Sequence, residues 1–353
     1  MNIQQLLGYV VEKNSSDLHL LVGSPPLVRI DGQLIPIPGE AILDSNGVEQ
    51  LLSGVMAPDQ KQVFLVNKEF DFSFELEKKA RFRVNSYFQK GTMAGSFRLI
   101  PMTIPAMESL GLPKIAHDFA NLKQGFILVT GPTGQGKSTT LASIIEEINQ
   151  TRRVHIVTIE DPIEYVYSSA KAIVSQREVH NDTHSWDIAL RSVLREDPDV
   201  VLVGEMRDFE TIAAALTIAE TGHLVFATLH TNSAAQTVDR IVDVFPENQQ
   251  PQVKLQLSNN LEGVLSQRLV PQINGGRSLA YEIMLGTPAI KTAIREGRTH
   301  MLDNIIMTSI EYGMTTLEMV LARLVKEGKI SFETAQAYAA RPADIQRFVK
   351  GEM

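Results

Sequence analysis

One stretch of the chain reads Gly131-Pro132-Thr133-Gly134-Gln135-Gly136-Lys137-Ser138-Thr139. It matches the phosphate-loop pattern G-x-x-x-x-G-K-[ST] at every fixed position. The apolar run Phe126–Val129 before it predicts a buried strand, and the apolar spacing in Thr140–Asn149 predicts a helix after it. A glycine-rich loop between a strand and a helix presents backbone N–H groups and a helix N-terminus to a phosphate. We therefore expect a nucleotide-binding loop rather than an ordinary strand–helix turn.

The predicted loop assigns roles to individual residues. All positions from Gly131 to Thr139 are expected to line the bound nucleotide, with the glycines supplying backbone donors. Lys137 is expected to reach the β- and γ-phosphates, and Ser138 to bind Mg²⁺. The expected cofactors are thus ATP and Mg²⁺.

Composition limits the class of protein. The chain has 353 residues, enough for two or three domains, and its 44% hydrophobic and 21% charged content is typical of a soluble globular protein. It has no cysteine, which excludes disulfides and thiolate metal sites and fits the cytoplasm. We expect no transmembrane helix, since no apolar run approaches about 18 residues, and no signal peptide, since the N-terminus has no basic region followed by an apolar one. The net charge of −8 argues against a DNA-coating role.

The first part of the chain predicts a small α+β domain over residues 1–100. Alternating and helical apolar patterns define its elements, and Asp31-Gly32 predicts a hairpin turn. The predicted helices are Ile3–Val11, Val48–Val55 and Pro58–Val66, and the predicted strands are Asp17–Val22, Leu27–Ile30, Leu34–Ile37, Phe70–Glu75, Arg81–Asn85 and Ala94–Ile100. Between Glu77 and Arg98 lies a local basic patch, which either meets an anionic partner or is simply solvated, and its arginines are expected on one exposed sheet face: Lys78, Lys79, Arg81, Arg83, Lys90 and Arg98.

The rest of the chain is predicted to form a proline-containing linker, a domain of alternating strands and helices, and a helical C-terminal region. Pro101, Pro105 and Pro113 predict a linker over residues 101–112. Over residues 113–288, apolar strands separated by helices predict a parallel sheet covered on both faces, with strands Phe126–Thr130, Val154–Ile159, Val200–Val203 and Leu224–Thr228. Residues 289–353 are expected to be helical, with helices Ala289–Glu296, Met301–Tyr312, Thr316–Lys326 and Ser331–Ala340.

Polar turns follow three of the predicted strands. Because ligands of open parallel sheets bind at the carboxyl ends of strands, these turns are expected to converge on the phosphate loop. Glu164, after the second strand, is a candidate to orient the attacking water. Glu205, in a Gly204-Glu205 variant of the Walker B element, is a candidate Mg²⁺ ligand, directly or through water. His230, after the fourth strand, is a candidate sensor of the γ-phosphate, whereas His223 is expected to be structural.

Taken together, these motifs resemble the Walker A, Asp box, Walker B and His box of the secretion ATPase superfamily. Further similar stretches are Ser16–His19 with Pro25–Gly32, Arg81–Asn85 with Phe97-Arg98, and Leu190–Asp199. The resemblance implies a PAS-like N-terminal domain, a RecA-like P-loop ATPase domain and a hexameric ring with nucleotide between the two domains. It also implies that arginines approach the phosphates within or between subunits; the candidates are Arg81, Arg83, Arg98 and Arg195, with Arg191 as a further one.

Within this superfamily the chain most resembles the type IV pilus retraction ATPases. Assembly and secretion ATPases usually carry a long N-terminal extension and a four-cysteine zinc module, whereas this chain is short and has no cysteine. Ala289–Glu296 resembles the retraction signature A-I-R-N-L-I-R-E and departs from it at Lys291, Thr292 and Ala293. Ile290 and Ile294 share the apolar face of this helix, and Lys291 and Arg295 are expected to point elsewhere.

The resemblance implies a motor that hydrolyses ATP to depolymerise pilin and drive twitching motility. It implies a cytoplasmic homohexamer at the inner face of the cytoplasmic membrane, peripherally associated with it. The inner-membrane platform protein is the implied partner, the pilin fibre is contacted indirectly, and no nucleic acid is expected. A paralogous pilus or type II secretion assembly ATPase, a DNA-translocating ring and a nucleotide-gated scaffold remain alternatives.

Overall fold

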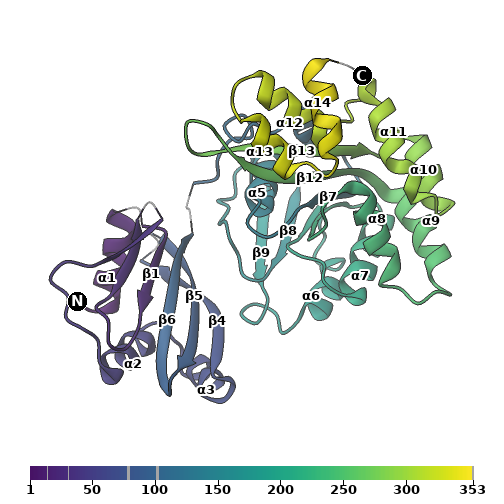
Figure 1. Cartoon of the computed structure of the whole chain (residues 1–353). Helices are drawn as coiled ribbons and strands as arrows, with labels where there is room; N and C mark the ends of the chain where they lie inside the picture. Colours follow the sequence, from purple (N-terminus) through teal and green to yellow (C-terminus); the bar gives the residue numbers. More distant parts are fainter. Residues whose placement is uncertain (14, 31, 78–79, 101–102, 352–353) are drawn as a thin grey trace. The chain divides into compact units, whose positions relative to one another are not determined.

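The computed structural model describes residues 1–13, 15–30, 32–77, 80–100 and 103–351 (Figure 1). The chain forms two compact units. One unit comprises Met1–Thr103 together with Pro162–Val166, and the other comprises Ile104–Asp161 together with Tyr167–Met353. Asp31 of the predicted turn, Lys78 and Lys79 of the basic run, and Pro101 of the linker lie outside the described residues.

In its described residues, the N-terminal unit is a six-stranded antiparallel sheet with the order β3-β2-β1-β6-β5-β4 and three helices. The strands are β1 (Asp17–Leu20), β2 (Leu27–Ile30), β3 (Gln33–Pro36), β4 (Glu69–Leu76), β5 (Ala80–Gln89) and β6 (Thr92–Ile100). The helices are α1 (Ile3–Glu12), α2 (Ser45–Ser53) and α3 (Pro58–Asn67). Every element predicted from the sequence of this region is present, although β1 ends at Leu20 rather than at Val22.

Alternation along β5 explains why one face of this sheet is polar. Phe82 and Val84 are fully buried in the core, whereas Arg81 and Arg83 lie on the opposite face, as a period of two residues requires. The β2–β3 hairpin closes next to Gly32, whose φ of +82° is costly for any residue with a Cβ. The sequence therefore fixes which side chains this sheet exposes.

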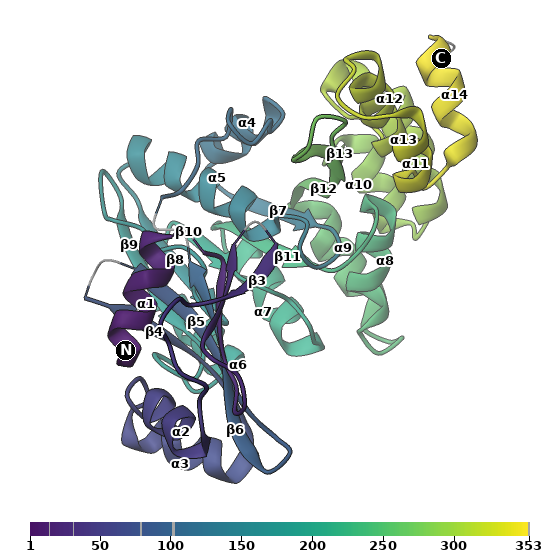
Figure 2. The same cartoon turned by 60° about the vertical axis from the view of Figure 1, so that its left-hand side comes forward.

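The C-terminal unit is built on a seven-stranded sheet with the order β13-β12-β7-β11-β10-β8-β9 (Figures 1 and 2). Neighbouring strands are parallel except β12 and β13, which form an antiparallel hairpin at one edge. The strands are β7 (Gly125–Thr130), β8 (His155–Glu160), β9 (Ile173–Glu178), β10 (Val200–Val203), β11 (Leu224–Leu229), β12 (Leu261–Pro271) and β13 (Arg277–Leu285).

Helices cover both faces of this sheet. Phe126 and Leu128 of β7 share one core with α6 to α11, while α5 packs on β7 with buried residues that lie outside that core, and α4 packs on α5. The helices are α4 (Ile115–Asn121), α5 (Lys137–Thr151), α6 (Trp186–Val193), α7 (Phe209–Glu220), α8 (Ala234–Asp243), α9 (Gln250–Asn260), α10 (Pro288–Arg295) and α11 (Leu302–Thr308). The doubly covered parallel sheet predicted from the sequence is confirmed.

Three more helices pack at the β12–β13 edge (Figure 1). They are α12 (Leu317–Lys326), α13 (Phe332–Tyr338) and α14 (Pro342–Lys350), and two 3₁₀ turns, Thr299–Met301 and Ile310–Tyr312, precede them. The helical character predicted for this region is confirmed, but α14 was not predicted. These helices belong to the same compact unit as the sheet rather than to a separate one.

Three strands were also missed by the sequence analysis: β9, β12 and β13. Polar residues interrupt the apolar run in β12, among them Glu262, Ser266 and Gln267. Ser266 and Gln267 are nevertheless buried, because β12 lies between β7 and β13. An apolar run therefore fails as a signal for strands whose buried positions hold polar side chains.

Candidate nucleotide-binding site

The phosphate loop connects the carboxyl end of β7 to the first turn of α5. Gly131, Gly134 and Gly136 have φ values of +142°, +77° and +82°, a region that disfavours residues with a Cβ. A Cβ on Gly131 would also lie 2.4 Å from the main-chain oxygen of Gln267. The positive φ values favour glycine at all three positions, of which Gly131 and Gly136 are fixed in the loop pattern, and the close approach leaves no room for a side chain at Gly131.

Lys137 begins α5 and its side chain folds back over the loop. Its ammonium group donates hydrogen bonds to the main-chain oxygens of Gly131 at 2.8 Å and Pro132 at 3.0 Å. Lys137 is only 8% exposed, so its positive charge is held at the loop rather than in solvent. This placement suits a cation that neutralises phosphate oxygens.

His230, just beyond the end of β11, lies beside this lysine. Its Nδ1 is 3.4 Å from Lys137 Nζ and 3.3 Å from Thr133 Oγ1, and its Nε2 is 3.1 Å from Glu205 Oε1. Lysine can only donate and a carboxylate can only accept, so Nδ1 is placed to accept a hydrogen bond and Nε2 to donate one. His230 thus links the phosphate loop to Glu205, as the strand-end argument predicted.

Glu205 follows β10 and joins this cluster through both of its oxygens. Oε2 accepts a hydrogen bond from Arg207 at 2.8 Å, while Oε1 faces His230. Burial on its own would raise the pKa of Glu205, but the hydrogen bond and charge of Arg207, with other nearby positive charge, lower it below the usual value. Glu205 is therefore ionised at neutral pH and able to bind a cation.

The roles of two residues near Glu205 were not predicted from the sequence. Arg207 was not predicted to belong to the site. An arginine two positions after the acid could have indicated the hydrogen bond that it donates to Glu205. Glycine is favoured at position 204 because a Cβ there would lie 3.2 Å from both Glu160 Cα and the main-chain oxygen of Ile159. Close approach of β10 to β8 accounts for glycine before the acid.

A buried carboxylate supports the segment that carries His230. Glu282 of β13 is 6% exposed, and its Oε1 accepts a hydrogen bond at 2.7 Å from Ala234 N, the first amide of α8. Burial, together with the negative charges of Asp303 on α11 and Glu318 on α12, raises its pKa to about 7, and Arg341 acts in the opposite direction. Glu282 thus titrates within the physiological range.

We predict that Glu282→Gln makes the protein more stable at pH 8 than the wild type. Folded Glu282 keeps its proton up to about pH 7, whereas an unfolded carboxyl loses it near 4.5. Unfolding therefore releases a proton between these values, and stability falls as pH rises through the window. The free energy of unfolding from urea titrations should differ by ~1–3 kcal/mol between wild type and variant at pH 8 and much less at pH 5.

The exposed Glu247→Gln is the matched control and should follow the wild type at both values. Parallel stability profiles for wild type and Glu282→Gln between pH 5 and pH 8 would contradict the assignment.

The remaining predicted residues of the C-terminal sequence lie in different places. Ser138 and Thr139 are half-buried in the first turn of α5. Glu164 is exposed in the segment 162–166, which groups with the N-terminal unit. His223 Nδ1 is 3.1 Å from the main-chain oxygen of Ile218, before β11 starts, which fits a structural role.

Arg195 lies away from the cluster within this chain. It is exposed in the turn between α6 and β10, at the amino ends of the parallel strands, whereas the phosphate loop follows the carboxyl end of β7. Arg191 is paired with Asp187 on the surface of α6 at 2.7 Å. A catalytic role for either arginine within one chain is therefore at odds with the topology.

In the N-terminal unit, strand register places the predicted arginines on one face. Arg83 of β5 lies opposite Arg98 of β6, and Arg98 lies opposite Asp17 of β1. Arg98 Nε donates to Asp17 Oδ1 at 3.0 Å, and Arg81 Nη2 donates to Ser73 Oγ at 2.7 Å. The basic face predicted from the sequence is thus partly neutralised by its own neighbours.

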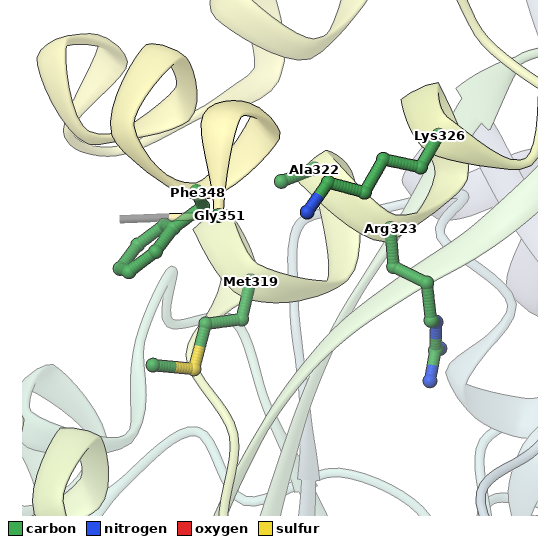
Figure 3. Close-up of a pocket in the computed structure, with 6 residues that line it drawn as sticks. All are labelled: Met319, Ala322, Arg323, Lys326, Phe348 and Gly351. Atoms are coloured by element: carbon green, nitrogen blue, oxygen red, sulfur yellow. The ribbon is translucent and has the colours of Figure 1, made fainter. Parts of the chain in front are cut away.

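A cavity of about 300 Å³ lies between α12 and α14 (Figure 3). Met319, Ala322, Arg323 and Lys326 of α12 line it together with Phe348 and Gly351. It is part of the C-terminal helices rather than of the cluster around Lys137. In the part of the chain that the structure describes, no helix is both long and apolar enough to span a membrane.

Comparison with known proteins agrees with this geometry. The family described as "Type II/IV secretion system protein" matches residues 106–312. This chain belongs to that family. It is 49% identical to the type IV pilus retraction ATPase PilT of Pseudomonas aeruginosa, over 97% of this chain and 99% of that protein. It is 39% identical to the type IV pilus ATPase PilU of the same organism, over 99% of this chain and 92% of that protein.

A solved relative extends the likeness to the whole fold. The crystal structure of the pilus retraction motor PilT with bound ADP matches with a TM-score of 0.92 and 46% identity, covering 98% of this chain and 99% of that one. The predicted resemblance to the secretion ATPases, and to their retraction members in particular, is confirmed.

Proposed function

We propose that this chain is an ATPase motor that powers type IV pilus retraction and twitching motility. The observation that carries the proposal is the 49% identity to PilT of P. aeruginosa along nearly the full length of both proteins. The site adds the chemistry: a complete phosphate loop, a lysine held at it, and an ionised glutamate linked to it through His230. These are the parts that phosphoryl transfer requires.

The residues present fit a bound Mg²⁺–ATP. The Ser138 hydroxyl and the Glu205 carboxylate form a hard-oxygen donor set of the kind that Mg²⁺ prefers. Bound there, Mg²⁺ would neutralise charge on the phosphates. Lys137 and the loop amides bind and orient the phosphates, His230 senses the γ-phosphate, and Glu164 positions the attacking water.

The domain assignment and assembly belong to the same proposal. Residues 1–100 form a PAS-like domain, 101–112 a linker, 113–288 a RecA-like ATPase domain and 289–353 its helical C-terminal region. Six chains form a ring in which Arg81, Arg83 and Arg98 complete nucleotide sites, and Arg195 acts only across subunits. The ring works in the cytoplasm against the inner-membrane platform protein, touches the pilin fibre only indirectly, and binds no nucleic acid.

Deleting the gene in a piliated host tests the direction of the motor. Loss of a retraction ATPase leaves pili that are made but not withdrawn, so the deletion strain should be hyperpiliated and unable to twitch. A strain without pili would instead identify an assembly ATPase. Turnover stimulated by DNA would favour a translocating ring.

The helix α10 bears on how the motor contacts its partner. Ile290, Ala293 and Ile294 are buried in the core, as predicted from their spacing. Lys291 does not point freely to solvent as expected, because its Nζ lies 3.0 Å from Glu262 Oε1 of β12 and secures the helix. Arg295 remains exposed, with one weak contact to Thr292 at 3.4 Å.

We predict that Arg295→Ala retains ATP hydrolysis and hexameric mass but fails to restore twitching to a retraction-deficient host. Arg295 is available for a polar contact with the platform protein, whereas Lys291 is engaged within the chain. Twitching-zone diameter on agar measures the effect, with native mass as the assembly check. The exposed Arg347→Ala, on α14, is the control and should restore twitching. If Arg295→Ala restores twitching fully, Arg295 is not needed for contact with the platform protein and α10 serves only in packing.

A further inference from the structure

Strand β12 extends beyond the end of β7. Past that point, the phosphate loop lies next to β12. The last residue of β7 paired with β12 is Thr130, which lies opposite Ser266. The next residues of β12, Gln267 to Leu269, pair with β13 on one edge, but on the other edge they face the loop instead of a strand. The backbone polar groups on this second edge therefore need partners other than a strand.

Gln135, a variable position of the loop pattern, bonds to this stretch through both its side chain and its main chain. Its side-chain Oε1 accepts a hydrogen bond from Leu269 N at 2.6 Å. Its main-chain oxygen accepts one from Gln267 Nε2, also at 2.6 Å. Two short hydrogen bonds thus attach a single loop residue to two positions of β12.

The glycines on either side pack against the same strand. A Cβ on Gly131 would lie 2.4 Å from Gln267 O, and one on Gly136 would lie 3.4 Å from Gln267 Nε2. Gln267 is 1% exposed, and its Oε1 has no hydrogen-bond partner among the described residues. A buried amide that leaves one acceptor unpaired is costly for the fold alone.

We propose that Gln267 and Gln135 form a bracket that holds the phosphate loop in the shape that binds nucleotide. Gln267 is a positioning residue that acts through Gln135 and the loop backbone, and it serves affinity rather than stability. This inference rests on the proposed nucleotide-binding function. It adds to that function a residue from the β12–β13 hairpin, which lies outside the motifs of the ATPase core.

The test compares three substitutions of glutamine by methionine, which keeps length and removes hydrogen bonding. Gln267→Met and Gln135→Met break the bracket from either side. Gln272→Met is the matched control, since Gln272 lies in the same hairpin and bonds to Ser278 Oγ at 2.8 Å rather than to the loop. The readouts are the Kd for ADP by calorimetry, the KM and kcat for ATP, and the melting temperature without nucleotide.

Each bracket variant should raise the Kd for ADP and the KM for ATP about fivefold, as expected from one lost hydrogen bond. The double variant should fall short of the product of the two single effects, because both contacts hold one loop. The melting temperature of Gln267→Met should stay within about 2 °C of the wild type, since removing the unpaired oxygen offsets the lost bond. The control should match the wild type throughout.

Other outcomes separate the inference from the function on which it rests. A wild-type protein that does not bind ADP would overturn both. Normal ADP binding by both bracket variants overturns the bracket alone. A melting temperature lowered by several degrees with an unchanged Kd also overturns it, because the contacts would then serve only the fold.

Discussion

Lys137→Ala should reduce ATP hydrolysis to background, a loss of at least about 100-fold in kcat. The ammonium group is held against the loop by the main-chain oxygens of Gly131 and Pro132, so its charge is in place before any phosphate arrives. No other described lysine is bonded to these loop carbonyls. Removing the charge takes away electrostatic stabilisation that loop amides alone do not replace. Phosphate release from the purified protein measures the effect.

Lys171→Ala is the control for the general loss of one positive charge, since Lys171 is exposed and lies before β9. It should hydrolyse ATP at the wild-type rate. Hydrolysis by Lys137→Ala at that same rate would mean that the site lies elsewhere in the chain.

The second large effect should separate Glu205 from Glu164. Glu205→Gln removes the ionised carboxylate that faces His230 and Arg207, so we expect loss of Mg²⁺-dependent turnover by about 100-fold or more. Glu164→Gln removes the residue proposed to position the attacking water. That variant should still bind ATP while hydrolysis stops. Equilibrium binding and phosphate release, measured on both variants, distinguish the two roles.

The opposite pattern would reverse the assignment. If Glu164→Gln no longer binds ATP while Glu205→Gln remains fully active, the metal-binding carboxylate is Glu164. Asp208 is a control on the same turn, because it caps α7 through Thr211 N at 2.9 Å. Asp208→Asn keeps a capping oxygen and should retain turnover.

Local rules predicted the elements around the site well. The loop pattern, the apolar strands and the strand-end rule are enough to predict that Lys137, Glu205 and His230 lie together. They succeed because each residue is placed by its own strand or helix. The same rules could not find Gln267, which meets Gln135 only because a late hairpin joins the sheet beside β7.

Other errors also arose from pairing between distant segments. Arg195 is a different case, because it precedes β10 of a parallel sheet, and the strand-end rule itself places it at the amino ends of the strands. Lys291 was predicted from helical spacing to point away from the apolar face, but its charge is paired with Glu262 of β12. Side-chain pairing across the fold is not encoded in local spacing.

Pilus shortening in single cells tests the central claim most directly. A piliated, retraction-deficient host would carry either the wild-type chain or Lys137→Ala, and labelled pili would be followed by fluorescence microscopy. The account predicts that pili shorten and cells twitch with the wild-type chain, and that pili stay extended with the variant. Equal shortening with both chains, or no shortening with the wild-type chain, would contradict a motor that retracts pili by hydrolysing ATP at this site.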